Sequence, residues 1–223
     1  MSTQPITLNL PGEKDYFTQE AYKALRSNIQ FCGKDIKVIA VTSVQENEGK
    51  STISLHVGKS FAELGKKVLV IDADMRKSVM AGRNTSAEKP NGLSELLTGL
   101  QDASECFYQV QDLDMYVMFA GTYPPNPVEL LSSNGFAELI KTCRAEYDYI
   151  IIDCPPLGMV IDAAVIAPLC DGTIMVMSSQ KVHYKQALNV IEQIEKSGAK
   201  FLGVVRNHKG KPEQKKSKEK KAE

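Results

Sequence analysis

The sequence has no excess charge of either sign and no organised set of cysteines. Its 27 basic residues are balanced by 27 acidic ones, whereas a domain that binds nucleic acid usually carries a basic surface. The five cysteines are odd in number, scattered and without a C-x-x-C pair, so they predict neither a disulfide framework nor a zinc site. We therefore expect a protein of the reducing cytoplasm with no nucleic-acid partner.

Long apolar runs are also missing. No stretch approaches the roughly 18 apolar residues of a membrane span, and residues 1–15 lack the cationic start and apolar centre of a signal peptide. The charge is uneven along the chain, because residues 208–223 hold seven lysines and three glutamates without apolar periodicity. We expect a soluble chain with a flexible segment over residues 1–17, one domain over residues 18–207, and a disordered lysine-rich tail beyond it.

Short apolar runs rich in β-branched residues alternate with segments of helical periodicity. Between the first two runs, for example, Ile53, Val57, Phe61 and Leu64 recur at helical spacing. Runs that are apolar on both faces belong in a parallel sheet covered by helices. The sequence therefore predicts an α/β fold, a mainly parallel central sheet with helices on both faces. The expected strands cover residues 37–43, 67–72, 115–121, 149–153, 172–178 and 199–205.

The segment after the first run resembles a phosphate-binding loop that lacks a glycine. It reads VTSVQENEGKST, and Gly49, Lys50 and Ser51 match the second half of the pattern G-x-x-x-x-G-K-S/T. Val44 stands at the place of the first glycine, and Asn47 softens this loss because asparagine tolerates left-handed backbone. Ligands of such sheets bind at the carboxyl ends of the strands, where this loop lies. Its N–H groups and Lys50 would hold phosphate, and the Ser51 hydroxyl would hold Mg²⁺.

Two further expected strands end in carboxylates. The stretch VLVIDADMR ends with Asp72, Asp74 and Arg76, and the stretch YIIIDCPP carries Asp153. A single aspartate of this kind is a common turn residue. Two such strands after a phosphate loop favour a site for a Mg²⁺-nucleotide, which needs hard oxygen ligands.

On these motifs the chain resembles the bacterial tyrosine kinases, the cytoplasmic autokinases that control capsule and exopolysaccharide synthesis and export. Their Walker A loop, D-x-D-x-R strand and D-x-P-P strand correspond here to NEGKST, VLVIDADMR and IIIDCPP. The resemblance covers about residues 20–207 and includes the stretches EAYKALRSNIQF, NGLSELLTG, AGTYPPNPVELL and IDAAVIA. The family often has another residue at the first loop glycine. The resemblance implies a P-loop NTPase-like α/β fold and a protein-tyrosine kinase that transfers the γ-phosphate of ATP to tyrosine hydroxyls.

The resemblance also implies roles for individual residues. Lys50 would act on the phosphates, Ser51 and Asp153 would hold Mg²⁺, Asp72 is the candidate base, and Asp74 would be a second metal-shell or positioning carboxylate. The sequence leaves open which aspartate accepts the proton. Asn207 matches the family's adenine-side residue, although a plain strand-end asparagine explains it equally well. The expected nucleotide-binding residues are thus Asn47, Glu48, Gly49, Lys50, Ser51, Thr52 and Asn207.

Two other classes share parts of this pattern. Partition and division-site ATPases have an additional lysine five positions before the loop lysine, which reaches across a dimer, and this position is Gln45 here. The missing lysine argues against a dimer of that kind. A nucleotide-binding scaffold without kinase activity is the other alternative, against which Lys50, Ser51, Asp72 and Asp153 weigh.

The resemblance further predicts partners. Glu20, Lys23 and Arg26 match the family's E-x-x-R-x-x-R association motif with lysine in place of the middle arginine. Because lysine lacks the bidentate geometry of arginine, we expect a ring that is held less tightly; a solvated stripe of ion pairs is the alternative. A transmembrane polysaccharide co-polymerase would activate the chain at the inner face of the cell membrane, with added attraction between the lysine-rich tail and anionic lipid.

The phosphate acceptor is where the sequence departs most from the family. Family members usually end in a tyrosine cluster, whereas residues 208–223 contain no tyrosine. Tyr16 lies in a polar segment before the first expected helix, and a flexible segment could reach an active site. We therefore expect weak autophosphorylation on Tyr16 or another N-terminal tyrosine, with the main tyrosine substrates in different proteins.

Overall fold

The computed structural model describes residues 4–12, 15–84, 90–178 and 183–207. Its centre is one eight-stranded sheet in the order β1-β4-β5-β3-β6-β2-β7-β8. All neighbours from β5 to β8 pair in parallel, whereas β4 is antiparallel to β5. The strands are β1 (Gln4–Ile6), β2 (Val38–Ser43), β3 (Val68–Asp72), β4 (Tyr108–Val110), β5 (Met115–Met118), β6 (Tyr149–Asp153), β7 (Gly172–Ser178) and β8 (Phe201–Asn207).

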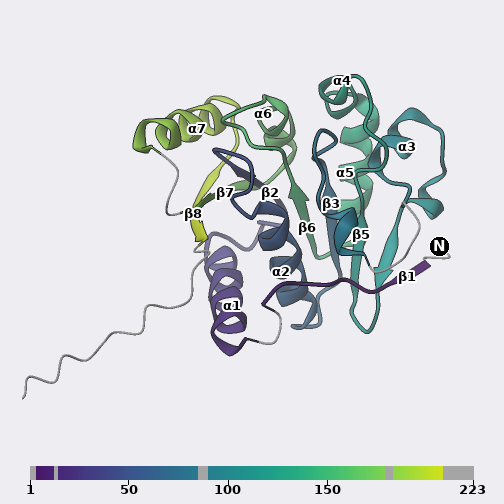
Figure 1. Cartoon of the computed structure of the whole chain (residues 1–223), viewed down its shortest axis with the longest axis horizontal. Coiled ribbons are helices and arrows are strands. Elements are labelled where there is room, and N and C mark those ends of the chain that lie inside the picture. The colour runs from purple at the N-terminus through teal and green to yellow at the C-terminus, as the bar shows by residue number, and fades with distance from the viewer. Residues whose placement is uncertain (1–3, 13–14, 85–89, 179–182, 208–223) are drawn as a thin grey trace, which may run out of the picture.

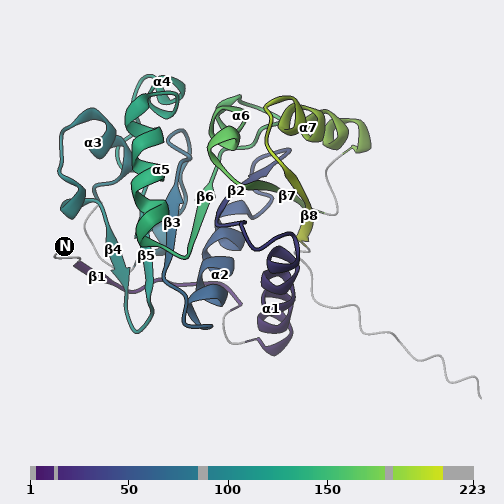
Figure 2. The same ribbon diagram turned by 180° about the vertical axis from the view of Figure 1, so that it is seen from behind.

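Helices cover both faces of this sheet. Helix α2 lies in front of the sheet in Figure 1, and α5 lies in front of it in the reverse view of Figure 2. Helix α1 packs against α2, and α3 to α7 belong to the opposite side. The α-helices are α1 (Tyr16–Phe31), α2 (Lys50–Ala62), α3 (Leu93–Thr98), α4 (Pro127–Leu131), α5 (Asn134–Glu146), α6 (Asp162–Ile166) and α7 (Tyr184–Lys196), with short 3₁₀ turns at Ala81–Arg83, Ala103–Glu105 and Ala167–Leu169.

The central strands are apolar because both of their faces are buried. Along β2, Val38 and Ala40 join the cluster on the α5 side, and Ile39 and Val41 join the cluster on the α2 side. Side chains alternate in this way along any strand, and full burial of each large apolar side chain contributes about 1.5–3 kcal/mol. The uninterrupted apolar runs of the sequence are the result.

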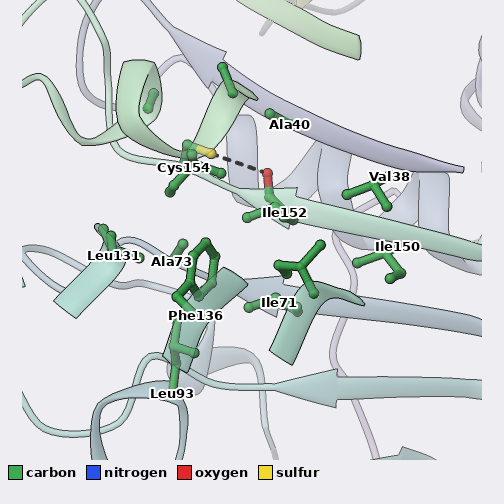
Figure 3. Close-up of a cluster of buried hydrophobic side chains, with 14 of the residues drawn as sticks. Val38, Ala40, Ile71, Ala73, Leu93, Leu131, Phe136, Ile150, Ile152 and Cys154 are labelled. Atoms are coloured by element: carbon green, nitrogen blue, oxygen red, sulfur yellow. Dashed lines mark hydrogen bonds between the residues drawn. The ribbon is translucent and has the colours of Figure 1, made fainter. Parts of the chain in front are cut away.

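The cluster on the α5 side extends to the end of β6 (Figure 3). Phe136 of α5 is fully buried and lies near Ala73 and Leu93. Cys154 directly follows β6, and its thiol donates to the Ile152 carbonyl over 3.5 Å. This packing supports the end of β6 from the α5 side, next to Asp153.

The predicted fold class and the six predicted strands are confirmed, with shifted ends. The run over residues 115–121 ends as a strand at Met118, and the last strand covers Phe201–Asn207. Strands β1 and β4, each of three residues, were not predicted. Within the described part of the chain, none of the helices has the combination of length and apolar character that crossing a membrane requires.

The described residues 4–12 pack against the rest of the domain, in a segment expected to be flexible over residues 1–17. Gln4–Ile6 pairs in parallel with β4, and Ile6, Leu8 and Leu10 are buried. The physical reason is the alternation of these apolar residues, which places them on one face of an extended chain. Helix α1 begins earlier than expected, at Tyr16. The tail over residues 208–223 lies outside the described residues, and the outer domain boundary stays a prediction.

Candidate active site

The loop between β2 and α2 has the backbone that the sequence suggested. Asn47 has a φ of 61° and Gly49 a φ of 96°, both in the left-handed region. A Cβ atom on Gly49 would lie 2.1 Å from Nδ2 of Asn207, so no other residue fits there without displacing Asn207. That Nδ2 donates to the Glu48 carbonyl over 2.8 Å. The end of β8 is therefore tied to the loop immediately before Lys50.

Val44 occupies the place of the first glycine without backbone strain. Among the described residues other than glycine, only Asn47 and Asp112 have a positive φ. The Val44 side chain is buried and belongs to the cluster on the α5 side. Its carbonyl closely faces Gly158, where a Cβ atom would come within 2.2 Å. The loop thus uses Val44 as a core residue.

The Glu48 side chain turns away from the pocket in front of the loop. It is 2% exposed, and its carboxylate accepts from the N–H groups of Val44, Gln45 and Ser178 over 2.9, 2.8 and 3.0 Å. The Glu48 side chain therefore stabilises the loop, whereas the sequence predicted that this residue contacts the nucleotide.

A pocket of about 250 Å³ lies in front of the loop. The expected residues Asn47, Gly49, Lys50, Ser51, Thr52 and Asp74 line it, together with Glu46, Arg76, Lys77, Val79, Arg83, Pro155, Pro156, Met159 and Val160. The expected residues Glu48, Asp72, Asp153 and Asn207 are not part of this lining. The phosphate loop and the D-x-D-x-R turn thus face one space, with the buried aspartates behind it.

Asp72 and Asp153 point to the same side of the sheet. They are paired neighbours at the ends of β3 and β6. Two residues earlier on the same strands, Val70 and Ile151 belong to the cluster on the α2 side, and the two-residue period places both carboxylates on that side too. The sheet register therefore brings together the aspartates that the sequence located only as separate strand ends.

Asp153 has one free oxygen in a buried position. Its Oδ1 accepts from the Ser54 hydroxyl over 3.3 Å, whereas its Oδ2 has no hydrogen-bond partner. Burial raises the pKa of the Asp153 carboxyl to about 6, an effect that the nearby Lys50 charge and Ser51 hydroxyl reduce and that Asp74 reinforces. A buried acceptor without a donor is suited to a cation.

Asp72 is also fully buried. The Ser78 hydroxyl donates to its Oδ2, and the Asp74 N–H donates to its Oδ1 over 3.1 Å. Burial, followed by the neighbouring charge of Asp153, raises the pKa of the Asp72 carboxyl well above its ordinary value. Asp72 is therefore held as a weak acid behind the pocket.

The turn after β3 is fixed by its own side chains. Asp74 Oδ1 accepts from the N–H groups of Arg76 and Lys77 over 3.4 and 3.0 Å. Arg76 forms a bidentate ion pair with Asp162, whose oxygens lie 2.6 and 3.0 Å from Nε and Nη2. Asp162 is fully buried at the start of α6. Asp162 lies in the stretch IDAAVIA, and the sequence predicted no role for it.

The donor set at the pocket fits Mg²⁺ completed by other oxygens. Among the described residues, no group of three or more His, Cys, Asp or Glu side chains could hold a metal. The free Asp153 oxygen and the Ser51 hydroxyl are hard ligands, and Mg²⁺ keeps waters and substrate phosphates as its remaining ligands. These two oxygens would form part of a Mg²⁺ site that a bound nucleotide would complete.

The expected association residues do not act alike. Lys23 and Glu20 form an exposed ion pair of 2.8 Å on α1. Arg26 is half-buried and donates through Nη1 to the Ser60 carbonyl of α2 over 2.6 Å. Its guanidinium thus contributes to the packing of α1 on α2, a contact that the motif did not reveal.

The expected acceptor Tyr16 is the first residue of α1 and is 66% exposed. Two other tyrosines, Tyr123 and Tyr184, are also exposed. By contrast, Tyr149 stacks on Phe61 with ring centroids 3.8 Å apart. Tyr16 is therefore accessible to solvent, whereas ring stacking holds Tyr149 against Phe61 of the core.

Comparisons with known proteins agree with this geometry. A family model described as an AAA domain matches residues 36–202. The tyrosine-protein kinase CpsD of Streptococcus pneumoniae is 43% identical over 204 residues, which cover 90% of each chain. The tyrosine-protein kinase YwqD of Bacillus subtilis is 35% identical and covers 93% of this chain and 84% of its own. A phosphate-loop fold of this kind binds nucleotides.

Solved structures give the same answer. The crystal structure of the chimerical protein CapA2B2 is 32% identical, with a TM-score of 0.83 and coverage of 92% of both chains. The residues that the family model matches, 36–202, include the loop and both aspartate strands. The chain therefore belongs to the bacterial tyrosine kinases, the family associated with capsule synthesis, and is a tyrosine-protein kinase of the CpsD type.

Proposed function

We propose that the pocket binds ATP with Mg²⁺ and transfers the γ-phosphate to tyrosine hydroxyls of proteins that control capsular or exopolysaccharide synthesis and export. The observation that carries this proposal is the free, fully buried oxygen of Asp153 beside Lys50 and Ser51. Asp153 would serve as the cation acceptor at the end of β6, with Lys50 as the phosphate-binding cation and Ser51 as the metal-binding hydroxyl at the end of the loop. The similarity to named tyrosine kinases supports the choice of acceptor.

Lys50 and the start of α2 would hold the phosphates. The N–H groups in the first turn of a helix have no intrahelical partner and attract anions. Lys50 is 7% exposed and lines the pocket, so its ammonium group would meet the phosphates in a site with little water. Mg²⁺ held by Ser51 and Asp153 would neutralise phosphate charge during transfer.

Asp72 remains the candidate base, with Asp74 as the positioning carboxylate. Burial raises the pKa of Asp72, and a higher pKa makes its carboxylate a stronger proton acceptor. Its Oδ2 accepts from the Ser78 hydroxyl and it does not line the pocket, whereas Asp74 does. A tyrosine hydroxyl would therefore reach Asp72 only after side chains between the pocket and Asp72 move. Asn207 would lie on the adenine side, and its hydrogen bond to the Glu48 carbonyl would position the loop.

A ring and a membrane partner complete the proposal. The exposed Glu20–Lys23 pair would contribute to self-association. A transmembrane polysaccharide co-polymerase would bind and activate the chain at the inner face of the membrane, which the family resemblance and the chimeric make-up of CapA2B2 support. Imaging of a fluorescent fusion tests this: the protein should move to the membrane on co-expression of such a partner, and diffuse fluorescence with unchanged phosphorylation would contradict it.

Calorimetry tests the nucleotide site. Lys50→Met should weaken Mg-ATP binding by at least about tenfold, because it removes the phosphate-binding charge. Asp153→Asn should weaken the dependence of binding on Mg²⁺ while leaving some binding of free ATP. Unchanged Mg-ATP affinity in both variants would exclude this pocket as the nucleotide site.

A further inference from the structure

We infer that Glu48 is a positioning residue: its carboxylate acts as an internal anion that holds the front half of the phosphate loop closed. The front amides are the N–H groups of Val44 and Gln45. The rear amides are the N–H groups of Lys50, Ser51 and Thr52. The inference rests on the proposed nucleotide site. The front amides bind the protein's own carboxylate, and the rear amides remain free to bind the nucleotide.

The contacts of Glu48 come from two separate segments. One carboxylate oxygen accepts from both front amides, at 2.9 Å from Val44 and 2.8 Å from Gln45. The other accepts from the N–H of Ser178, the last residue of β7, over 3.0 Å. A carboxylate that is 2% exposed is stable only if donors compensate for lost water. Three N–H groups arranged around it form an anion site of the kind that loops offer to phosphate.

This arrangement leaves the rear amides as the phosphate donors. The front amides point at Glu48 and are engaged within the protein. Lys50, Ser51 and Thr52 begin α2, where N–H groups lack intrahelical partners and the helix end is positive. All three residues line the pocket, whereas Glu48 does not.

Glu48 also connects the loop to β8. Its carbonyl accepts from Asn207 Nδ2 over 2.8 Å, so one residue bonds to the ends of two strands through its side chain and main chain. Gly49 and Lys50 directly follow Glu48, so the contacts of Glu48 fix where the main chain enters α2. Without the carboxylate, the front amides would lose their acceptor and the main chain before Lys50 would be less firmly positioned.

A purely structural role is distinguishable, because the chain contains a matched glutamate away from the pocket. Glu95 of α3 is 6% exposed. Its carboxylate accepts from the N–H groups of Gly92 and Thr122 over 2.8 and 2.9 Å and from the Thr122 hydroxyl over 2.6 Å. It has three donors, like Glu48, but does not line the pocket.

The variants Glu48→Gln and Glu95→Gln therefore separate the two roles. Both should lower the melting temperature of the nucleotide-free protein, because each replaces an oxygen acceptor by an amide donor. Only Glu48→Gln should weaken Mg-ATP binding, by about tenfold, in calorimetry below both melting temperatures. Equal affinity in Glu48→Gln and the wild type, or an equal loss in both variants, would overturn the inference.

Amide hydrogen exchange on the full wild-type chain provides a test that does not depend on whether a variant folds. The N–H groups of Val44, Gln45 and Ser178 should be protected without nucleotide and change little when Mg-ATP is added, while the rear amides gain protection. Front amides that exchange freely until Mg-ATP is added would overturn the inference. A wild type that binds no ATP would instead contradict the proposed function, and the protection of the front amides would still test the role of Glu48.

Discussion

Asp72 and Asp153 are directly paired on β3 and β6, and both carboxyl groups are fully buried on the α2 side of the sheet. The charge of Asp153 is one of the causes that raise the pKa of Asp72. The protein alone therefore holds two carboxyl groups together in a place where their charged forms are poorly solvated and repel each other. A bound cation would relieve this repulsion, which explains why an arrangement unfavourable for stability suits a nucleotide site.

The first prediction concerns stability against pH. The pKa of Asp153 is about 6 in the folded protein, against an ordinary value of 3.8, so the folded state binds a proton that the unfolded chain has already released. The contribution of Asp153 to stability should therefore fall as pH rises from about 4 to about 6, by on the order of 2 kcal/mol. Urea unfolding without nucleotide and with a chelator measures it.

The matched variant for this experiment is Asp153→Asn. It should be more stable than the wild type at pH 7 and about equal to it at pH 4, because the wild-type carboxyl is then mostly protonated. The difference between the two proteins is the useful quantity, since the pKa values of Asp171 and Glu95 are lowered and act in the opposite sense. Parallel stability profiles from pH 4 to pH 7 would show that Asp153 is not perturbed.

The sequence was sufficient for the sheet and for the motifs at its edge. Continuous apolar runs predicted buried strands, and Lys50, Asp72 and Asp153 could be located at strand ends because the carboxyl ends of parallel strands share one edge. The sequence could not show that β3 and β6 are neighbours, since β2 precedes both along the chain and lies beyond β6 in the sheet. Pairing of Asp72 with Asp153 is a property of strand order, which local patterns do not encode.

The second prediction concerns Arg26. Arg26→Ala removes a hydrogen bond to the Ser60 carbonyl and should destabilise the protein by about 1–2 kcal/mol. Glu20→Ala combined with Lys23→Ala removes an exposed ion pair and should change stability by less than about 0.5 kcal/mol. Thermal unfolding of the two proteins checks this difference. Equal melting temperatures would contradict the described contact between α1 and α2.

The third prediction concerns self-association. Because Arg26 also supports the fold, the exposed Glu20 and Lys23 are the cleaner sites at which to test a ring. Light scattering should give a larger mass for the wild type than for the double variant Glu20→Ala, Lys23→Ala. The same mass for both proteins at several concentrations would remove this surface from the association model.

The fourth prediction concerns the acceptor. Tyr16 is exposed at the start of α1, so Tyr16→Phe should remove most of any phosphate that the chain transfers to itself. Tyr184→Phe is the control, because Tyr184 is 77% exposed and its loss should leave autophosphorylation nearly unchanged. Peptide mapping identifies the modified residue. Phosphate at high occupancy on the stacked Tyr149 would contradict this assignment.

Side-chain direction was the part of the site that the sequence could not supply. Glu48 lies in the loop and was expected at the nucleotide, yet its carboxylate is bound by three main-chain N–H groups. Asp162 received no role, although it forms a bidentate ion pair with Arg76. Ser178 is 130 residues from Glu48, and Arg76 is 86 residues from Asp162, so no motif spacing could predict these two contacts. The contacts of Glu48 with Val44 and Gln45 are local, but they depend on the fold of the loop.

The most direct measurement is mass spectrometry of phosphotyrosine after incubation with Mg-ATP, comparing the wild type with Lys50→Met. The wild type should form phosphotyrosine on itself or on an added substrate protein by transfer of the ATP γ-phosphate. Lys50→Met should form at least about a hundredfold less, because the phosphates lose the cation that positions them. Equal phosphotyrosine in the two proteins, or none on any candidate substrate from a wild type that binds Mg-ATP normally, would contradict the assignment of this pocket as the kinase site.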